Sequence, residues 1–191
     1  MKPENILWFN ETDNHTSEAV LQITDLGLGR FHRFGSKSKD DPRTVGGSAT
    51  YIPPEMVLPK ARITRAYDIW SLGCVFLEFV TWMVEGYDAV GEFSNARLEI
   101  SEDGVKDDTF FTHTENSTVV RAGVIRWVQR LRQNRRCSGM IQDLLDLTMN
   151  QMLRIVVKER IDSGGLKAGL DGILAKARDT GTATADYVLG R

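Results

Sequence analysis

Side chains that could bind ions or exchange protons are grouped in short stretches of this sequence. KPEN at residues 2–5 contains a lysine and an amide, and TDLGLGR at residues 24–30 places Asp25 after an apolar run and beside two glycines. GSATYIPPE at residues 47–55 ends on an acid, Glu55. Taken singly, each stretch has an ordinary explanation, because an Asp in an Asp-x-Gly sequence is most often a turn residue and a lysine near a terminus is usually solvated. Whether these residues could act in one chemical site depends on whether the stretches are parts of a single known motif pattern.

The order of these stretches resembles the eukaryotic protein kinase family. KPEN at residues 2–5 is similar to the end of the catalytic loop, which has a lysine two positions after its catalytic Asp and an Asn farther on. DLG at residues 25–27 stands where the family has D-F-G, with Leu26 as a smaller apolar residue. Residues 47–55 are similar to the G-T-x-x-Y-x-A-P-E that closes the activation segment, and YDIWSLG is similar to the family's central helix. The resemblance covers residues 1–174.

The resemblance implies phosphoryl transfer, in which positioning and charge neutralisation carry most of the catalysis. Asn5 and Asp25 would hold Mg²⁺ ions on the phosphates of ATP, and oxygen ligands of this kind suit Mg²⁺. Gly27 belongs to the same cofactor-binding motif. Lys2, as in Ser/Thr kinases, would contact the transferred phosphate. The resemblance thus assigns Lys2, Asn5 and Asp25 to catalysis, with ATP and Mg²⁺ as cofactors.

An activation segment is expected between residues 31 and 55. Residues 31–44 are polar, basic and serine-bearing, so they have little to bury. Thr44 stands three residues before Gly47, where many kinases carry the activating phosphate, although an ordinary loop threonine is an equal alternative. Ser48 replaces the usual threonine of the substrate-docking loop and keeps the hydroxyl. Pro53 replaces the usual alanine and stiffens the loop without removing Glu55.

Residues 67–80 must position these motifs. This stretch is apolar on nearly every side, which is typical of a membrane span or of a helix at the centre of a core. Asp68, Ser71, Gly73 and Glu78 interrupt it well short of the roughly 20 apolar residues that a bilayer requires. We therefore expect a buried helix with other elements around it. Asp68 should accept backbone hydrogen bonds, because an unpaired buried carboxylate is unfavourable.

Shorter elements are expected on either side of this helix. Residues 6–9 and 19–23 should be strands of a hairpin joined by a polar turn at residues 10–17. Residues 119–131 have apolar residues at helical spacing. The basic run that follows, residues 130–136, is either a docking or nucleic-acid patch or, as we favour, a solvated helix end.

The last third of the sequence contains two further capping signals and one more motif. Ser138 can cap a helix that has Ile141 and Leu145 on its apolar face. KERID at residues 158–162 resembles the last kinase signature, in which Arg160 would form a buried ion pair with Glu55. Asp162 or Ser163 can cap a final helix that reaches Leu174.

Composition is that of a soluble globular domain of 191 residues, with 41% hydrophobic and 26% charged residues. A net charge of −2 provides no pull towards nucleic acid or an anionic membrane, so neither is expected as a partner. The two cysteines, Cys74 and Cys137, cannot form a disulfide framework, and this indicates a reducing, intracellular setting, cytoplasmic or nuclear. The expected partners are a protein substrate with Ser or Thr and a kinase or regulatory protein.

The predicted fold class is mainly α, a kinase-like C-terminal lobe with a small N-terminal β-hairpin and without the N-terminal lobe. Residues 1–174 would form this partial kinase domain, and residues 175–191 would be a disordered polar tail. The sequence contains no glycine-rich loop and no V-A-I-K lysine, and Met1 stands one residue after the expected position of the catalytic Asp.

Three hypotheses follow. The chain is a truncated Ser/Thr kinase lobe that is inactive alone, a noncatalytic pseudokinase-like binding or scaffold module, or a nonfunctional gene fragment. The reading frame upstream of Met1 discriminates between the first hypothesis and the other two: an in-frame H-R-D and glycine-rich loop would favour the first, and a nearby in-frame stop would favour the others.

Overall fold

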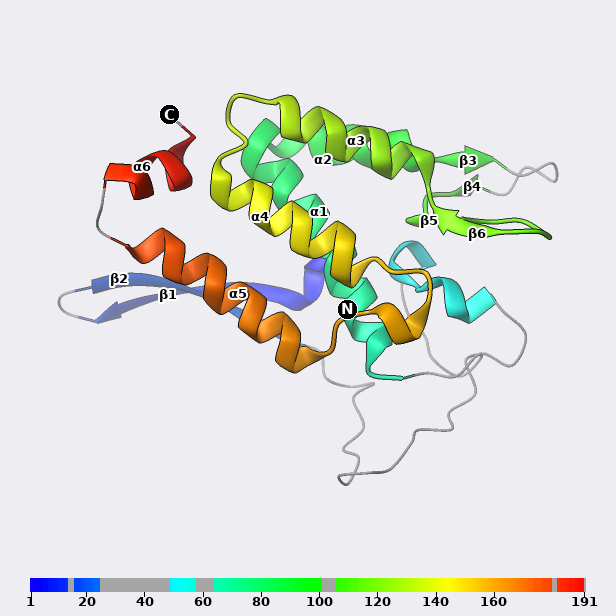
Figure 1. Cartoon of the computed structure of the whole chain (residues 1–191), viewed down its shortest axis with the longest axis horizontal. Coiled ribbons are helices and arrows are strands. Elements are labelled where there is room, and N and C mark those ends of the chain that lie inside the picture. Colours follow the sequence, from blue (N-terminus) through cyan, green and yellow to red (C-terminus); the bar gives the residue numbers. More distant parts are fainter. Residues whose placement is uncertain (14–15, 25–48, 58–63, 101–105, 180–181, 191) are drawn as a thin grey trace, which may run out of the picture.

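The computed structural model describes residues 1–13, 16–24, 49–57, 64–100, 106–179 and 182–190. Helices dominate these residues (Figure 1), and the strands among them form three separate two-stranded pairs. The predicted mainly α class with a small hairpin near the N-terminus is confirmed.

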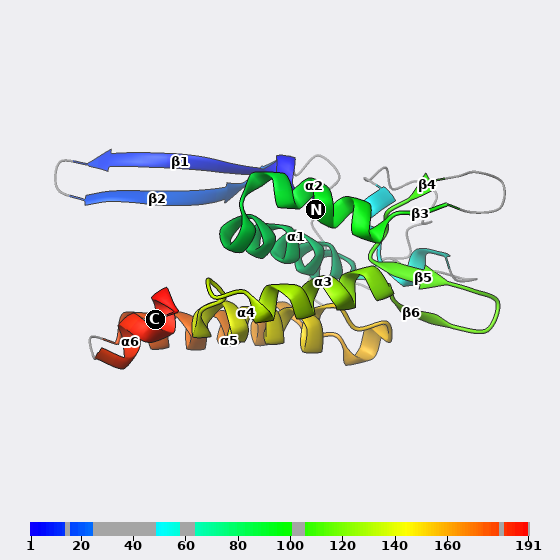
Figure 2. The same ribbon diagram turned by 90° about the horizontal axis from the view of Figure 1, so that it is seen from above.

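Helix α1 (Ala66–Glu85) is the centre of the fold. Trp70, Cys74 and Leu77 are fully buried in it, and several of the other helices pack against it (Figure 2). The helix ends at Gly86, whose φ of 95° lies in the region that favours glycine. The predicted central helix at residues 67–80 is confirmed and continues to Glu85.

By length and composition α1 could also cross a membrane, and 56% of its most apolar window is buried inside the protein. Its buried residues pack against aromatic and aliphatic side chains of the following elements, among them Phe93, Phe111 and Leu145. A helix that is covered in this way is the core helix of a globular fold.

Helices α2 (Tyr87–Arg97) and α3 (Ala122–Gln133) pack on one another and on α1. The Phe93 and Trp127 rings stack with centroids 5.3 Å apart, and the Trp127 indole donates to Thr81 Oγ1 at 3.0 Å. Gly123 allows this close crossing, because a Cβ there would lie 2.0 Å from the carbonyl oxygen of Ala96.

Two small strand pairs connect α2 with α3. Their strands are β3 (Glu99–Ile100), β4 (Lys106–Asp107), β5 (Phe111–His113) and β6 (Thr118–Val120). The prediction of a helix from residue 119 was therefore wrong at its start, because residues 119 and 120 belong to β6. Valine is β-branched and favours strands, which outweighed the helical spacing there.

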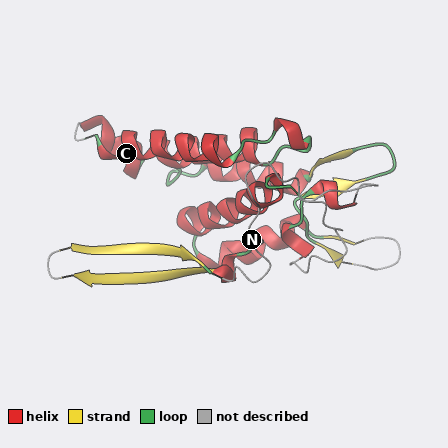
Figure 3. Ribbon diagram, turned by 90° about the horizontal axis from the view of Figure 1, so that it is seen from below, coloured by secondary structure: helices red, strands yellow, loops and turns green. Residues whose placement is uncertain are grey.

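Strands β1 (Ile6–Asp13) and β2 (Thr16–Ile23) form the predicted hairpin, which projects from the helices (Figure 3). They pair antiparallel from Ile6 opposite Ile23 to Asp13 opposite Thr16. The predicted eight-residue turn was wrong, since all but two of its residues continue the strands. Backbone pairing outweighed the polar composition of that stretch.

Helix α4 (Gly139–Leu147) runs into a π-helical turn, η6 (Thr148–Met152). The predicted cap of α4 is present, because Ser138 Oγ accepts from the Ile141 amide at 3.4 Å. A short 3₁₀ turn, η7 (Val157–Glu159), leads to helix α5 (Ser163–Arg178). Of the two candidate caps of α5, Asp162 is the one that acts, accepting from the Gly165 amide at 2.8 Å.

The structure corrects the prediction of a disordered polar tail at residues 175–191. Helix α5 continues to Arg178, and a further helix, α6 (Thr182–Leu189), packs on α4 and α5. The Tyr187 hydroxyl donates to Asp143 Oδ2 at 2.8 Å, and Lys176 donates to the same oxygen at 2.6 Å. This shared carboxylate holds a short polar segment that composition alone placed in solvent.

Candidate functional site

The base of the β1–β2 hairpin positions the residues predicted at the metal site. A 3₁₀ turn, η1 (Pro3–Asn5), begins with proline, whose fixed φ suits the first position of a helical turn. The Asn5 amide donates to the Lys2 carbonyl at 3.1 Å, and the Asn5 carbonyl accepts from the Thr24 amide at 2.7 Å and the Thr24 hydroxyl at 3.2 Å. Asn5 is thereby held beside the residue that immediately precedes Asp25.

Four predicted residues, Asp25, Gly27, Thr44 and Ser48, lie outside the described residues. The fit of a Mg²⁺–nucleotide group can therefore be tested at Asn5 and Lys2, both half-buried. An amide oxygen is a suitable hard ligand and an ammonium a suitable phosphate partner. The donor set at this end of the hairpin fits the group, and no cluster of three metal-ligating acids, histidines or cysteines occurs within the described ranges.

Glu55 and Arg160 form the pair that the sequence predicted. Glu55 lies in the 3₁₀ turn η5 (Pro54–Val57), and its two carboxylate oxygens each accept from a different nitrogen of Arg160 at 2.9 Å. The side chains are 9% and 0% exposed. This bidentate geometry is the strong form of an arginine–carboxylate contact.

Arg160 also ties together parts of the backbone. Its guanidinium donates to the carbonyl of Ala66, in the first turn of α1, at 2.6 Å, and to the carbonyl of Arg154 at 3.0 and 3.2 Å. It lies 5.2 Å from the Trp70 ring centroid. The donors of the buried guanidinium are thus matched by acceptors, as a buried charge requires. The end of the 47–55 motif is consequently anchored to the start of the central helix.

Asp68 differs from expectation. The sequence predicted a buried carboxylate holding backbone amides, but Asp68 is an exposed residue with no such hydrogen bond among the described residues. Neighbouring groups nevertheless remove enough of the hydration of the Asp68 carboxylate to raise its pKa. Asp68 lies in the first turn of α1, where a negative charge interacts favourably with the helix dipole. This position explains why an acid is accommodated in an otherwise apolar helix.

The sequence did not single out the contacts that hold residues 49–51 in the 3₁₀ turn η4 (Ala49–Tyr51). Ser71 Oγ donates to the Tyr51 carbonyl at 2.9 Å, and the Tyr51 hydroxyl donates to Glu78 Oε2 at 2.9 Å. Burial raises the pKa of Glu78, while the guanidinium of Arg97 lowers it, and the net shift is upward. Glu78 could have been noticed as an acid within the most apolar helix, since such a residue needs a partner.

The basic run at residues 130–136 is partly neutralised by acids of the same chain. Arg130 pairs with Glu85 at 2.6 Å and Glu92 at 3.3 Å, and Arg132 pairs with Asp146 at 2.7 Å. These contacts favour the interpretation of this run as an ordinary helix end.

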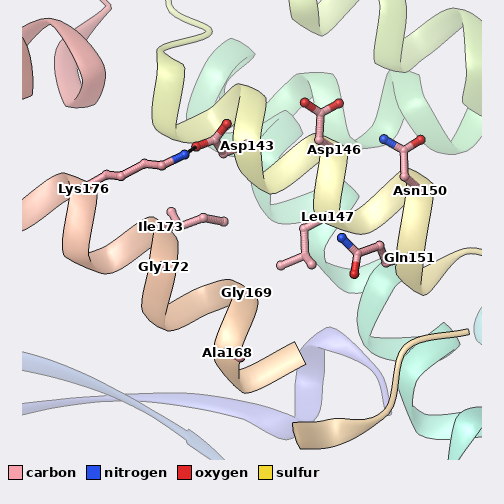
Figure 4. Close-up of a pocket in the computed structure, with 10 residues that line it drawn as sticks. All are labelled: Asp143, Asp146, Leu147, Asn150, Gln151, Ala168, Gly169, Gly172, Ile173 and Lys176. Atoms are coloured by element: carbon pink, nitrogen blue, oxygen red, sulfur yellow. Dashed lines mark hydrogen bonds and ion pairs between the residues drawn. The ribbon is translucent and has the colours of Figure 1, made fainter. Parts of the chain in front are cut away.

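An open groove between α4 and α5 lies apart from the predicted site (Figure 4). Lys176 and Asp143 close one end of it, and Leu147 and Ile173 lie in its floor. Gly169 brings the helices together, because a Cβ there would stand 3.0 Å from a methyl carbon of Leu147. Neither Asn5 nor Glu55 lines this groove.

Comparison with known proteins identifies the family. Residues 1–162 match the protein kinase domain family, so this chain belongs to the protein kinases. The match ends twelve residues before residue 174, the limit expected from the sequence.

Several curated kinases are similar to part of the chain. Cyclin-dependent kinase E-1 of Arabidopsis thaliana is 33% identical over 81 residues, 42% of this chain and 16% of that protein. Serine/threonine-protein kinase bur1 of Neurospora crassa is 33% identical over 109 residues, 52% of this chain and 18% of that protein. Cyclin-dependent kinase 11 of Dictyostelium discoideum is 39% identical over 67 residues, 35% of this chain and 18% of that protein. The chain thus spans less than a fifth of the length of these relatives, and no solved structure matches it.

Proposed function

We propose that this chain supplies the metal-binding and protein-substrate-binding part of a Ser/Thr protein kinase, which transfers phosphate from ATP to a protein hydroxyl. The Glu55–Arg160 pair carries the proposal, because it joins the 47–55 and 158–162 motifs across 105 residues of sequence. The kind of substrate hydroxyl is supported by Lys2 in KPEN and by the name of the Neurospora crassa relative, a Ser/Thr kinase.

The residues at the base of the hairpin would act by position. Asn5 and Asp25 would hold Mg²⁺, which when bound neutralises charge on the phosphates. Lys2 would place a positive charge beside the transferred phosphate. The hydrogen bonds from Thr24 to the Asn5 carbonyl keep the two metal-binding stretches together.

The 191-residue polypeptide by itself is proposed to be inactive. A general base contributes about 10²–10⁴-fold to a rate, and the kinase base would stand before Met1, outside the 191 residues that are assayed. Asp25 cannot replace it, because its carboxylate would be occupied by the metal. The sequence also has no glycine-rich loop to cover the nucleotide.

A radiolabelled-ATP assay with generic Ser/Thr protein substrates, combined with calorimetry of ATP–Mg²⁺ binding, tests the inactivity. We expect background transfer and weak binding. Robust transfer that disappears in an Asp25→Ala variant would show that the 191 residues are sufficient, and would at the same time support the kinase function.

A chimera tests phosphoryl transfer itself. The part of the Dictyostelium discoideum cyclin-dependent kinase 11 that ends at its catalytic Asp is joined to Met1 and assayed with and without the cyclin that its name implies. We expect transfer that is lost in Asn5→Ala and Asp25→Ala, while Asn95→Ala, an exposed amide in α2, keeps it. A folded chimera that binds ATP and transfers nothing would contradict the proposal and favour the noncatalytic binding module.

A further inference from the structure

Two buried arginines outside the kinase motifs organise the segment between α2 and α3. Arg97 and Arg121 are 1% and 2% exposed. Arg121 donates to the Arg97 carbonyl at 2.6 Å, to the Asp107 carbonyl at 2.8 Å and to Asp107 Oδ2 at 2.9 Å. These bonds join the end of α2 to strand β4 and so fix the backbone on both sides of the β3–β4 pair.

Arg97 is the centre of a second network. Its Nη2 donates to Glu78 Oε1 at 3.1 Å, and its Nε donates to the Asp108 carbonyl at 3.1 Å. The guanidinium lies between two aromatic rings, 4.2 Å from the centroid of Phe93 and 4.1 Å from that of Phe110. Such stacking stabilises a cation that has left water. Arg97 therefore fixes both acids relative to α1 and α2.

Both acids hold residues in the middle of the 47–55 motif. Asp108 Oδ1 accepts from the Thr50 hydroxyl at 2.7 Å, and Glu78 Oε2 accepts from the Tyr51 hydroxyl at 2.9 Å. Adjacent residues of one turn are thus each bound to an acid, and the two acids share one arginine. Charge-assisted bonds of this kind are stronger than those between neutral groups.

We propose that Glu78 of α1, Arg97 at the end of α2 and Asp108 after β4 form a clamp that positions the turn at residues 49–51, with Arg97 and Asp108 as positioning residues. Glu78 and Arg97 provide the buried part of the clamp, and Asp108 the part that reaches Thr50. An effect of the clamp on substrate binding rests on the proposed kinase function, in which residues 47–55 correspond to the substrate-docking end of the activation segment. The clamp itself is a property of the folded chain without nucleotide.

Amide hydrogen exchange of the 191-residue chain without nucleotide tests the clamp. In Asp108→Ala, we expect the amides of residues 50–52 to exchange about tenfold faster, while those of α1 stay unchanged. Asp108→Asn keeps an acceptor oxygen for the Thr50 hydroxyl and should restore most of the protection. Asp88→Ala is the matched control, because Asp88 is an exposed acid of α2 with no side-chain hydrogen bond or ion pair within the described chain.

A double-mutant cycle with Thr50→Val separates the contact from a general loosening of the fold. If Asp108 acts through Thr50, the double variant should exchange no faster at residues 50–52 than either single variant. Additive increases, equal acceleration in Asp88→Ala or unchanged exchange in Asp108→Ala would each overturn the clamp. Because no phosphate is transferred in this experiment, its failure would leave the kinase proposal unaffected, and failure of the chimera would leave the clamp unaffected.

Discussion

Helix α1 and the β1–β2 hairpin contain similar apolar side chains in opposite surroundings. Leu77 of α1 is fully buried, whereas Leu21 and Ile23 of β2 are 51% and 48% exposed. Helix α1 packs against helices on several sides, while β1 and β2 pair only with each other among the described strands. A lone two-stranded hairpin is at best marginally stable in water.

The comparison separates two ways of placing functional residues. In the helical part, buried side chains such as Glu55 and Arg160 fix the geometry. At the hairpin base, the geometry is fixed by hydrogen bonds from Thr24 to the Asn5 carbonyl, and the apolar side chains nearby are largely exposed. We therefore expect the helical part to respond strongly to single substitutions and the hairpin only weakly.

The largest effect is expected at the buried ion pair. Arg160→Ala leaves the Glu55 carboxylate without its partner and should lower the free energy of unfolding by about 3–5 kcal/mol. Urea denaturation provides the measurement. Arg154→Ala is the control, because its ion pair with Glu159 joins side chains that are 44% and 51% exposed and should be worth at most about 1 kcal/mol. Equal losses in the two variants would refute a special role for the buried pair.

Truncating one leucine in each region tests the comparison directly. Leu77→Ala creates a cavity in the core and should cost about 2–5 kcal/mol, whereas Leu21→Ala removes a side chain already half in solvent and should cost less than about 1 kcal/mol. Both are measured by urea denaturation under the same conditions. A similar cost at both sites would mean that a partner or a second copy covers the hairpin in solution.

A smaller effect is expected at alkaline pH. Burial raises the pKa of Tyr51, and the nearby Glu78 carboxylate raises it further. The folded state then keeps a proton that the unfolded chain releases above about pH 10, so this contribution is present below that pH and is lost as the pH rises.

Thermal unfolding between about pH 8 and 11 measures the loss, and Tyr51→Phe should flatten the slope. Tyr87→Phe is the comparison variant, because Tyr87 is 82% exposed and the substitution should leave the slope unchanged. An unchanged slope in Tyr51→Phe would mean that Tyr51 ionises normally in the folded protein.

The smallest effect belongs to an exposed pair on α5. Lys167 and Asp171 are one helical turn apart, with side chains 76% and 58% exposed. Lys167→Ala should change the free energy of unfolding by no more than about 0.5 kcal/mol, and added salt should remove the difference. A loss comparable with that of Arg160→Ala would contradict the distinction between buried and exposed pairs.

Much of the fold follows from local signals in the sequence. The apolar load of residues 67–80 predicted α1, and Ser138 predicted the start of α4, because capping and helical periodicity act over only a few residues. The Glu55–Arg160 contact was predicted from motif order, although the distance between the two residues in sequence hides it from any local rule.

Other features of the fold could not be predicted from local signals in the sequence. The hairpin strands are longer than their composition indicated, because main-chain pairing can extend through polar residues. Residues of helix α6 were predicted to be a disordered tail. The hydrogen bond from Tyr187 of α6 to Asp143 joins residues 44 positions apart, so no local signal indicates it. Asp68 was predicted to be buried, since its neighbours in sequence are apolar, but the residue is exposed.

The sequence by itself determined the kinase motifs, the central helix and the helix caps, since these depend on residue types at short spacing. Only the tertiary structure decided which charged residues are buried. By residue type alone, Arg97 and Arg121 would be expected at the surface. They are buried because aromatic rings, carbonyl groups and acids from distant elements surround them. Burial of a guanidinium requires such partners, and they come together only once the chain has folded.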